Sequence, residues 1–198
     1  MVDSIPWHKK SYEVLFERLH IPFSEEYYKK NIVGHKNSEI FPELFPEKDK
    51  EEWDNLAYEK EAIFREIYES TIKEIDGLTD LINKLKSKGT TLAIATTAPL
   101  ENRIFFLDKL NLHESNFSAI VGDEEIIQGK PHPEAYLKVA ERIEIEPDLC
   151  LVFEDSASGI KSAKSAGMTV VAVTTNNMPE TLGEADYIVD TFRDIEIL

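Results

Sequence analysis

Residues 149–160 read LCLVFEDSASGI, and the rest of the chain can be arranged around this segment. An apolar run ends here in two acids, Glu154 and Asp155, and the chain then passes through Ser156 and Gly159 into a predicted helix. The acid pair therefore stands at the carboxyl end of a buried strand. This is the edge at which open α/β sheets bind ligands.

Two adjacent carboxylates at this edge repel each other unless a cation lies between them or one takes up a proton. Oxygen ligands at a strand end suit Mg²⁺, so Glu154 and Asp155 are candidate ligands of this metal. The alternative is that they cap the following helix and face water. The segment by itself leaves both interpretations open.

The composition bounds the class of protein. With 198 residues, of which 42% are hydrophobic, the chain suits one domain with an insertion or two small domains. The formal net charge of −16 makes nucleic acid and anionic membrane surfaces poor partners. A small anionic substrate would therefore need a local positive site.

Cysteine usage and targeting patterns indicate a reducing compartment. Cys150 is the single cysteine, so an intrachain disulfide is ruled out, and its apolar neighbours predict a buried thiol. No secretory signal pattern precedes the first predicted helix, and no apolar run has the length of a membrane span. We expect a cytoplasmic protein.

Residues 5–73 are predicted to form a helical module, with helices at 6–20, 24–31, 37–44 and 48–72. Ser24 is the expected N-cap of the second helix and Gly34 its end. His8 lies on the apolar stripe of the first helix, where a histidine belongs either to the edge of the core or to a site. Lys60 lies on the stripe of the fourth helix. Its ammonium either extends to solvent, the more common outcome, or points into a site.

The chain after residue 73 is predicted to alternate between strands and helices. Strands are expected at 90–96, 118–121, 149–153, 168–174 and 187–189, and helices at 78–88, 99–110, 132–143 and 156–166. Such alternation predicts a doubly wound parallel sheet that is covered by helices on both faces.

Polar groups also follow the strand predicted at 90–96. The hydroxyl of Thr96 and the free backbone N–H groups of Thr97 and Ala98 stand just before a helix. There they form a possible binding site for a phosphate or an oxyanion. Ordinary helix capping produces the same pattern, so this signal is weak when it stands alone.

A third polar group is Lys130, in the loop GKPHP at residues 129–133. Two prolines fix this loop, and a fixed ammonium suits a phosphate oxygen. The alternative is a solvated lysine in a rigid turn. A hydroxyl, a cation and an acid pair at the same edge of one sheet form a set suited to phosphoryl transfer.

The order of these groups resembles motifs two, three and four of the haloacid dehalogenase (HAD) superfamily. The helical module resembles the α-helical cap of the β-phosphoglucomutase-like branch, and residues 2–8, VDSIPWH, are similar to the segment after its catalytic loop. The resemblance covers nearly the whole chain. It implies a cap at 5–73 and a Rossmann-like HAD core made of residues 1–4 and 74–198.

The resemblance also implies roles for the core residues. Thr96, with Thr97 and Ala98 beside it, would bind the transferring phosphoryl group. Lys130 would neutralise the charge of that group and orient the nucleophile. Asp155 would hold Mg²⁺, with Glu154 in or beside the metal shell.

In the cap, the resemblance makes His8 and Lys60 residues that contact the substrate or couple cap closure to the chemistry. The implied substrate is a small phosphorylated metabolite such as a sugar phosphate. The cap loop at 34–37, GHKN, lacks the arginine that the phosphoglucomutase itself has there. This favours a phosphatase over a mutase.

The first motif of the family, Asp-x-Asp-Gly at the end of the central strand, is missing, because the chain contains no Asp-x-Asp. Its first Asp would be the nucleophile that forms an aspartyl-phosphate. Either the sequence is truncated at its start, which we favour because the later motifs are intact, or the protein lost this strand and works without catalysis.

Loss of that strand would leave the strands at 90–96 and 149–153 without ladder partners between them. Each unpaired buried backbone group costs about 1–3 kcal/mol. We therefore expect the two strands to close onto each other, or a strand from another chain to fill the gap. The protein would be a monomer, or a dimer if the missing strand is supplied in that way.

Two functional hypotheses follow from the sequence. The first is a Mg²⁺-dependent phosphatase or phosphomutase by lineage, nearly inactive as it stands because the nucleophile is absent, with Mg²⁺ held weakly or not at all. The alternative is a non-catalytic protein that keeps a phosphate pocket at Thr96 and Lys130 or binds a partner through its open sheet.

Overall fold

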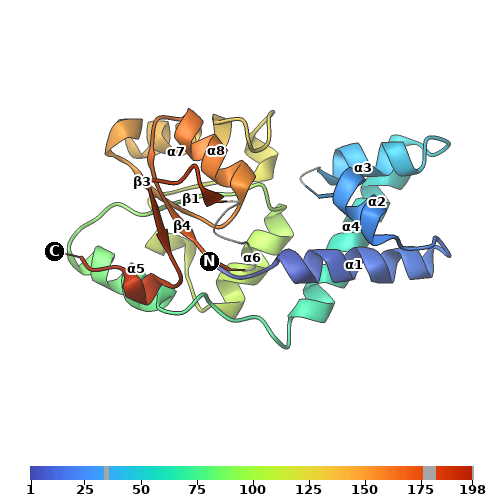
Figure 1. The fold of residues 1–198 in the computed structure, drawn as a ribbon, viewed down its shortest axis with the longest axis horizontal. Coiled ribbons are helices and arrows are strands. Elements are labelled where there is room, and N and C mark those ends of the chain that lie inside the picture. Colours follow the sequence, from blue (N-terminus) through green and yellow to red (C-terminus); the bar gives the residue numbers. More distant parts are fainter. Residues whose placement is uncertain (34–35, 176–181, 198) are drawn as a thin grey trace. The chain divides into compact units, whose positions relative to one another are not determined.

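The chain folds into two compact units, a helical unit, Ser4–Ile72, and an α/β unit, Met1–Asp3 with Lys73–Leu198. This computed structural model describes residues 1–33, 36–175 and 182–197. Gly34, the expected end of the second helix, and part of the 34–37 loop lie outside the described residues. Figure 1 shows the two units.

The helical unit contains α1 (Ile5–Arg18), α2 (Glu25–Asn31), α3 (Asn37–Leu44) and α4 (Lys50–Tyr68). Ser24 caps α2 as predicted, because its hydroxyl accepts a hydrogen bond from the Tyr27 amide at 3.3 Å. At the start of α4, the carboxylates of Asp49 and Glu52 each accept from the other residue's amide, at 3.0 and 3.1 Å. This capping box begins α4 at Lys50, two residues later than expected.

The core of the helical unit is aromatic and aliphatic, and α1 packs against α4. Burying one such side chain contributes about 1.5–3 kcal/mol. The buried cluster consists of Tyr12, Leu15, Phe16, Tyr28, Ile32, Ile40, Phe41, Leu56 and Ile63.

The α/β unit alternates strands and helices, and the ladders among its described residues are parallel, which confirms the predicted fold class. Its strands are β1 (Ala93–Ala95), β2 (Ala119–Val121), β3 (Leu151–Glu154), β4 (Thr169–Val173) and β5 (Tyr187–Val189). Its helices are α5 (Leu78–Ser87), α6 (Leu100–Lys109), α7 (Glu134–Ile143) and α8 (Ala157–Ser165).

Helices cover both faces of the strands. On one face, buried residues of α7 and α8 form clusters with β2 and β4, including Ala163, which is fully buried, and Val170. On the other face, Leu81 of α5 and Leu107 of α6 pack with Val173 of β4. In Figure 1, α7 and α8 lie together on one side of β3 and β4, and α5 lies on the other. The unit is therefore a three-layer α/β/α fold.

The sheet is interrupted between β1 and β3. Within the described residues, β1 pairs only with β2, and β3, β4 and β5 form a separate sheet. The expectation that the two flanking strands close onto each other is therefore wrong. Ala95 of β1 and Val152 of β3 pack against the same hydrophobic cluster, so side chains rather than a ladder connect the two sheets.

The strands on either side of the interruption are not fully buried. Residues Ala93–Ala95 are half-buried, and Leu151 is 53% exposed. Backbone groups on an incompletely buried edge can hydrogen-bond to water, which reduces the cost that we expected. Pairing on one side only also explains why β1 has three residues in place of the seven expected. That a strand from another chain fills this position stays a prediction.

The two ends of the helical unit join the α/β unit at one place. Val2 forms an antiparallel bridge with Glu74, and the Ile75 amide donates a hydrogen bond to the Met1 carbonyl at 2.9 Å.

No helix in the described ranges 1–33, 36–175 and 182–197 combines the length and apolar character needed to cross a membrane. Cys150 is half-buried, whereas the sequence predicted a fully buried thiol.

Candidate active site

The site forms around Glu154, the last residue of β3, which is 8% exposed. One carboxylate oxygen, Oε2, accepts hydrogen bonds from the Asp155 amide at 3.1 Å, the Ser156 amide at 3.3 Å and the Ser156 hydroxyl at 3.1 Å. The other, Oε1, accepts from the Lys130 ammonium and from the Tyr136 hydroxyl, the latter at 2.6 Å. The alternative in which Glu154 faces water is therefore wrong.

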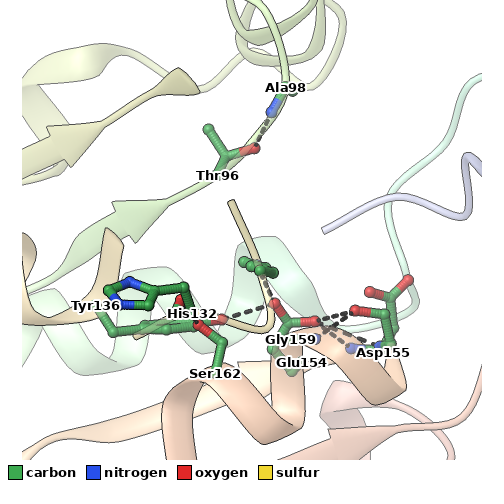
Figure 2. Close-up of polar contacts among 10 residues, drawn as sticks. Thr96, Ala98, His132, Tyr136, Glu154, Asp155, Gly159 and Ser162 are labelled. Carbon is green, nitrogen blue, oxygen red and sulfur yellow. Dashed lines mark hydrogen bonds and ion pairs between the residues drawn. The ribbon is translucent and has the colours of Figure 1, made fainter. Parts of the chain in front are cut away.

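The loop after β3 turns tightly because of two small residues. Ser156 is the N-cap of α8, and its hydroxyl accepts from the Gly159 amide at 3.0 Å while it donates to Glu154. A Cβ on Gly159 would collide with the Glu154 carboxylate. A side chain at this position would have to displace the carboxylate, which lies directly against the first turn of the helix (Figure 2).

Lys130 reaches this carboxylate from the loop between β2 and α7. It forms an ion pair with Glu154, and the exposed fractions of the two side chains are 14% and 7%. The Lys130 Nζ also lies 5.1 Å from the centre of the Tyr136 ring. The alternative of a solvated surface lysine is therefore wrong, and the positive charge lies at the edge where ligands bind.

The charges of the site shift one another. Burial by itself would raise the pKa of Glu154, but the Lys130 ammonium and the hydrogen bonds to the carboxylate hold this pKa below its ordinary value. For Asp155, burial and the neighbouring Glu154 carboxylate raise the pKa. The α-amino group of Met1 interacts electrostatically with both acids, and its burial lowers its own pKa.

Thr96 follows β1, and its amide continues the ladder by donating to the Val121 carbonyl at 3.0 Å. Its hydroxyl accepts a hydrogen bond from the Ala98 amide at 3.0 Å, so that N–H is not free, contrary to expectation. Figure 2 shows Thr96 and Ala98 on one side of the view and the group around Glu154 on the other. Within the described residues, no hydrogen bond joins Thr96 to Lys130 or Glu154.

His8 and Lys60 lie in the helical unit and contact each other. The Lys60 Nζ is 2.8 Å from the His8 Nδ1 and 2.8 Å from the Glu61 Oε1. Lys60 is 3% exposed, so the more common outcome, an ammonium that extends to solvent, is wrong here. Burial and the Lys60 charge lower the pKa of His8 to about 3. A neutral His8 accepts from Lys60 through Nδ1 and carries its proton on Nε2.

A chain of hydrogen bonds extends this pair through the helical unit. The Asn37 amide donates to Glu61 at 2.8 Å, and the Tyr12 hydroxyl donates to Asn37 at 2.6 Å. The His8 ring stacks on Phe64 with centroids 3.9 Å apart. Each buried polar group has a partner, so the network ties α1, α3 and α4 together.

The residues present do not complete a Mg²⁺ site. In the part of the chain that the structure describes, no group of three or more His, Cys, Asp or Glu side chains is placed to hold a metal ion. Glu154 already accepts hydrogen bonds from five donors, and a carboxylate offers about four lone-pair positions. A metal ion at Glu154 would have to displace one of these donors.

Several residues of the two polar clusters, one in each unit, were not predicted from the sequence. Tyr136 lies on the apolar stripe of α7, where an aromatic residue suggests only core packing. Asn37 and Glu61 carry no motif that links them to Lys60. The one available signal was a charged residue, Lys60, at a core position of a helix, because such a residue requires buried polar partners.

The parallel strands of the α/β unit carry a lysine and an acid pair near the carboxyl end of β3, the set of groups that, in the sequence, indicated phosphoryl transfer. The chain belongs to the haloacid dehalogenase-like hydrolase family, which it matches over residues 1–173. The family resemblance predicted from the motifs is thereby confirmed.

Individual relatives support the same lineage. The chain is 31% identical over 169 residues to a phosphorylated carbohydrates phosphatase of Thermotoga maritima, covering 85% of this chain and 77% of that protein. It spans less than half the length of two plant relatives that it also matches.

Solved structures agree in fold. A HAD hydrolase of family IA from Entamoeba histolytica superposes with a TM-score of 0.86 at 30% identity, covering 100% of this chain and 91% of that one. A β-phosphoglucomutase from Clostridium difficile superposes with a TM-score of 0.81 at 22% identity, covering 99% and 88%. The latter likeness concerns the fold alone.

Proposed function

We propose that the chain derives from a Mg²⁺-dependent phosphatase or phosphomutase that acts on a small phosphorylated metabolite such as a sugar phosphate. The observation that carries this proposal is the cluster of buried Glu154 with half-buried Lys130 and Asp155 at the carboxyl end of β3. In a chain with a net charge of −16, this lysine is the local cation that an anionic substrate requires. The relative from Thermotoga maritima, by its name, acts on phosphorylated carbohydrates.

In this proposal Lys130 neutralises the charge of a phosphate group, because an ammonium has three donors and only one of them is directed to Glu154. Thr96 keeps its hydroxyl proton available for a phosphate oxygen, since its oxygen already accepts from Ala98. His8 and Lys60 belong to the helical unit, which acts as the cap that selects the substrate. Asp155 is the carboxylate that we assign to Mg²⁺.

The chain as it stands should have little or no activity, because it contains no Asp-x-Asp to supply the nucleophile. The reaction of the lineage passes through an aspartyl-phosphate, an instance of covalent catalysis. Mg²⁺ is held weakly or not at all, because two carboxylates do not complete a site and one of them is occupied by donors. We further infer a cytoplasmic location from the single free cysteine.

The test compares this chain with one extended at its amino end by an apolar strand that ends in Asp-x-Asp-Gly. Since the Met1 amino group interacts with Asp155 and Glu154, the extension begins beside the acid pair. We expect release of phosphate from sugar phosphates by the extended chain only. A matched extension ending in Asn-x-Asn-Gly should stay inactive. Equal activity of the original and extended chains would contradict the assignment.

A second candidate function is binding without catalysis, and the observation that favours it is the Lys130 ammonium held beside Glu154. The protein would then keep a phosphate pocket at Thr96 and Lys130, or bind a partner chain at the edges of β1 and β3. Titration calorimetry with inorganic phosphate separates this candidate from the first. Micromolar affinity of the chain as it stands, lost in Lys130→Met, supports binding. No detectable affinity speaks against it.

A further inference from the structure

The Glu154 carboxylate is organised around Lys130. All of its donors other than Lys130 and Tyr136 come from the adjoining turn, at residues 155 and 156. These local bonds fix the orientation of the carboxylate, because they converge on Oε2 alone. The other oxygen, Oε1, is thereby held where the loop containing Lys130 and the helix containing Tyr136 both reach it.

Tyr136 contacts both members of this ion pair. Its hydroxyl donates to Glu154 Oε1 at 2.6 Å, and the centre of its ring lies 5.1 Å from the Lys130 Nζ. The side chain comes from α7 and is 5% exposed, so its position is set by core packing. A rigid buried ring thus presents a hydrogen bond to the anion and its π face to the cation.

A lysine side chain ordinarily loses considerable rotamer freedom when it is fixed in one place. Here, two buried side chains contribute to holding it, and only one donor of the ammonium is directed to Glu154. The remaining N–H groups stay available for a ligand oxygen.

We propose that Glu154 and Tyr136 are a positioning pair that holds the Lys130 ammonium for a phosphate oxygen, and that Glu154 serves this purpose in place of binding metal. The phosphate part rests on the function proposed above. The positioning part rests only on the contacts just described.

The experiment measures how fast an amine-directed acylating reagent labels each lysine, read by peptide mass spectrometry. Lys164, which is ion-paired with Asp186 at 2.7 Å and has a side chain 36% exposed, serves as the internal comparison. Tyr136→Phe keeps the ring and removes the hydroxyl. It should raise the labelling rate of Lys130 roughly two- to tenfold, the ratio that corresponds to one hydrogen bond. Glu154→Gln keeps the shape and removes the charge, and should raise the rate about tenfold or more.

Tyr187→Phe is the matched control, because Tyr187 lies on β5 and is 63% exposed. It should leave the labelling of Lys130 unchanged. An unchanged Lys130 rate in Tyr136→Phe, or an equal rise at Lys164, would overturn the positioning role, since a general loosening of the unit affects both lysines. Melting curves confirm that each variant is folded, and if one variant fails to fold the other carries the test.

Inorganic phosphate separates the two parts of the proposal. Added to the unmodified chain, it should slow the labelling of Lys130 and leave that of Lys164 as it was. If phosphate gives no protection while both variants still raise the Lys130 rate, the phosphate role fails and the positioning pair stands.

Discussion

The neutral His8 makes the helical unit sensitive to acid. Its pKa is lowered from 6.5 to about 3 by burial and by the Lys60 charge. When the pH falls below 6.5, the unfolded chain binds a proton at His8 that the folded unit does not accept. The stability due to the neutral imidazole is therefore complete above about pH 6.5 and is lost progressively as the pH falls toward about 3.

The magnitude follows from the width of this window. Each pH unit below the unfolded pKa costs about 1.4 kcal/mol. At about pH 5 the free energy of unfolding should be about 2 kcal/mol lower than at about pH 7.5 because of His8 alone. Above about pH 5 most carboxylates in the unfolded chain remain ionised, so their contribution to the difference is small.

The assay is urea unfolding followed by tryptophan fluorescence. Both tryptophans of the chain, Trp7 and Trp53, lie in the helical unit, so the signal reports on this unit. His8→Gln is the reference, because a glutamine oxygen can accept from Lys60 but does not titrate. Lys60 is present in both proteins, so its own titration largely cancels.

We expect the unmodified chain to lose about 2 kcal/mol more than His8→Gln between about pH 7.5 and about pH 5. Equal losses in the two proteins would refute the reasoning. They would mean that His8 is protonated in the folded unit without cost, which conflicts with its burial beside Lys60.

Two pairs of substitutions test the packing of the α/β unit. Gly77 and Gly89 both have positive φ, but a Cβ on Gly77 would lie 2.8 Å from a backbone nitrogen, whereas one on Gly89 would meet nothing within 4 Å. Gly77→Ala should therefore lower the free energy of unfolding by about 1 kcal/mol more than Gly89→Ala, measured by urea unfolding with circular dichroism. Gly159→Ala would drive a methyl group into Glu154 and should lose about 2 kcal/mol or more. Lys161→Ala, exposed on the same helix, is its control. Equal stability within either pair would contradict the packing described.

Elements with local signals were predictable from the sequence. The Ser24 cap, the break after residue 20 and the alternation after residue 73 placed the helices within a few residues. The strands were less predictable, because a strand ends where its ladder ends. The length of β1 depends on β2 and on the interrupted edge, and neither is visible in residues 90–96.

The chemistry of the site was predictable only in part. The strand ends indicated that Lys130 and Glu154 share one edge of the sheet, and the structure brings them into contact. The contacts of Tyr136 and Lys60 depend on partners that are distant in sequence, such as Asn37 for the network around Glu61. The binary pattern of a helix places a side chain inward but does not say what its polar atom meets.

The bridge between Val2 and Glu74 joins the chain segments on either side of the helical unit, so the unit is a closed insertion in the α/β unit. Closing a flexible loop of roughly 70 residues would cost about 4 kcal/mol of chain entropy. A folded helical unit holds its own ends at a fixed separation and so removes much of this cost in advance. Chain entropy therefore couples the stabilities of the two units. Acid that melts the helical unit would also weaken the attachment of residues 1–3 to the α/β unit.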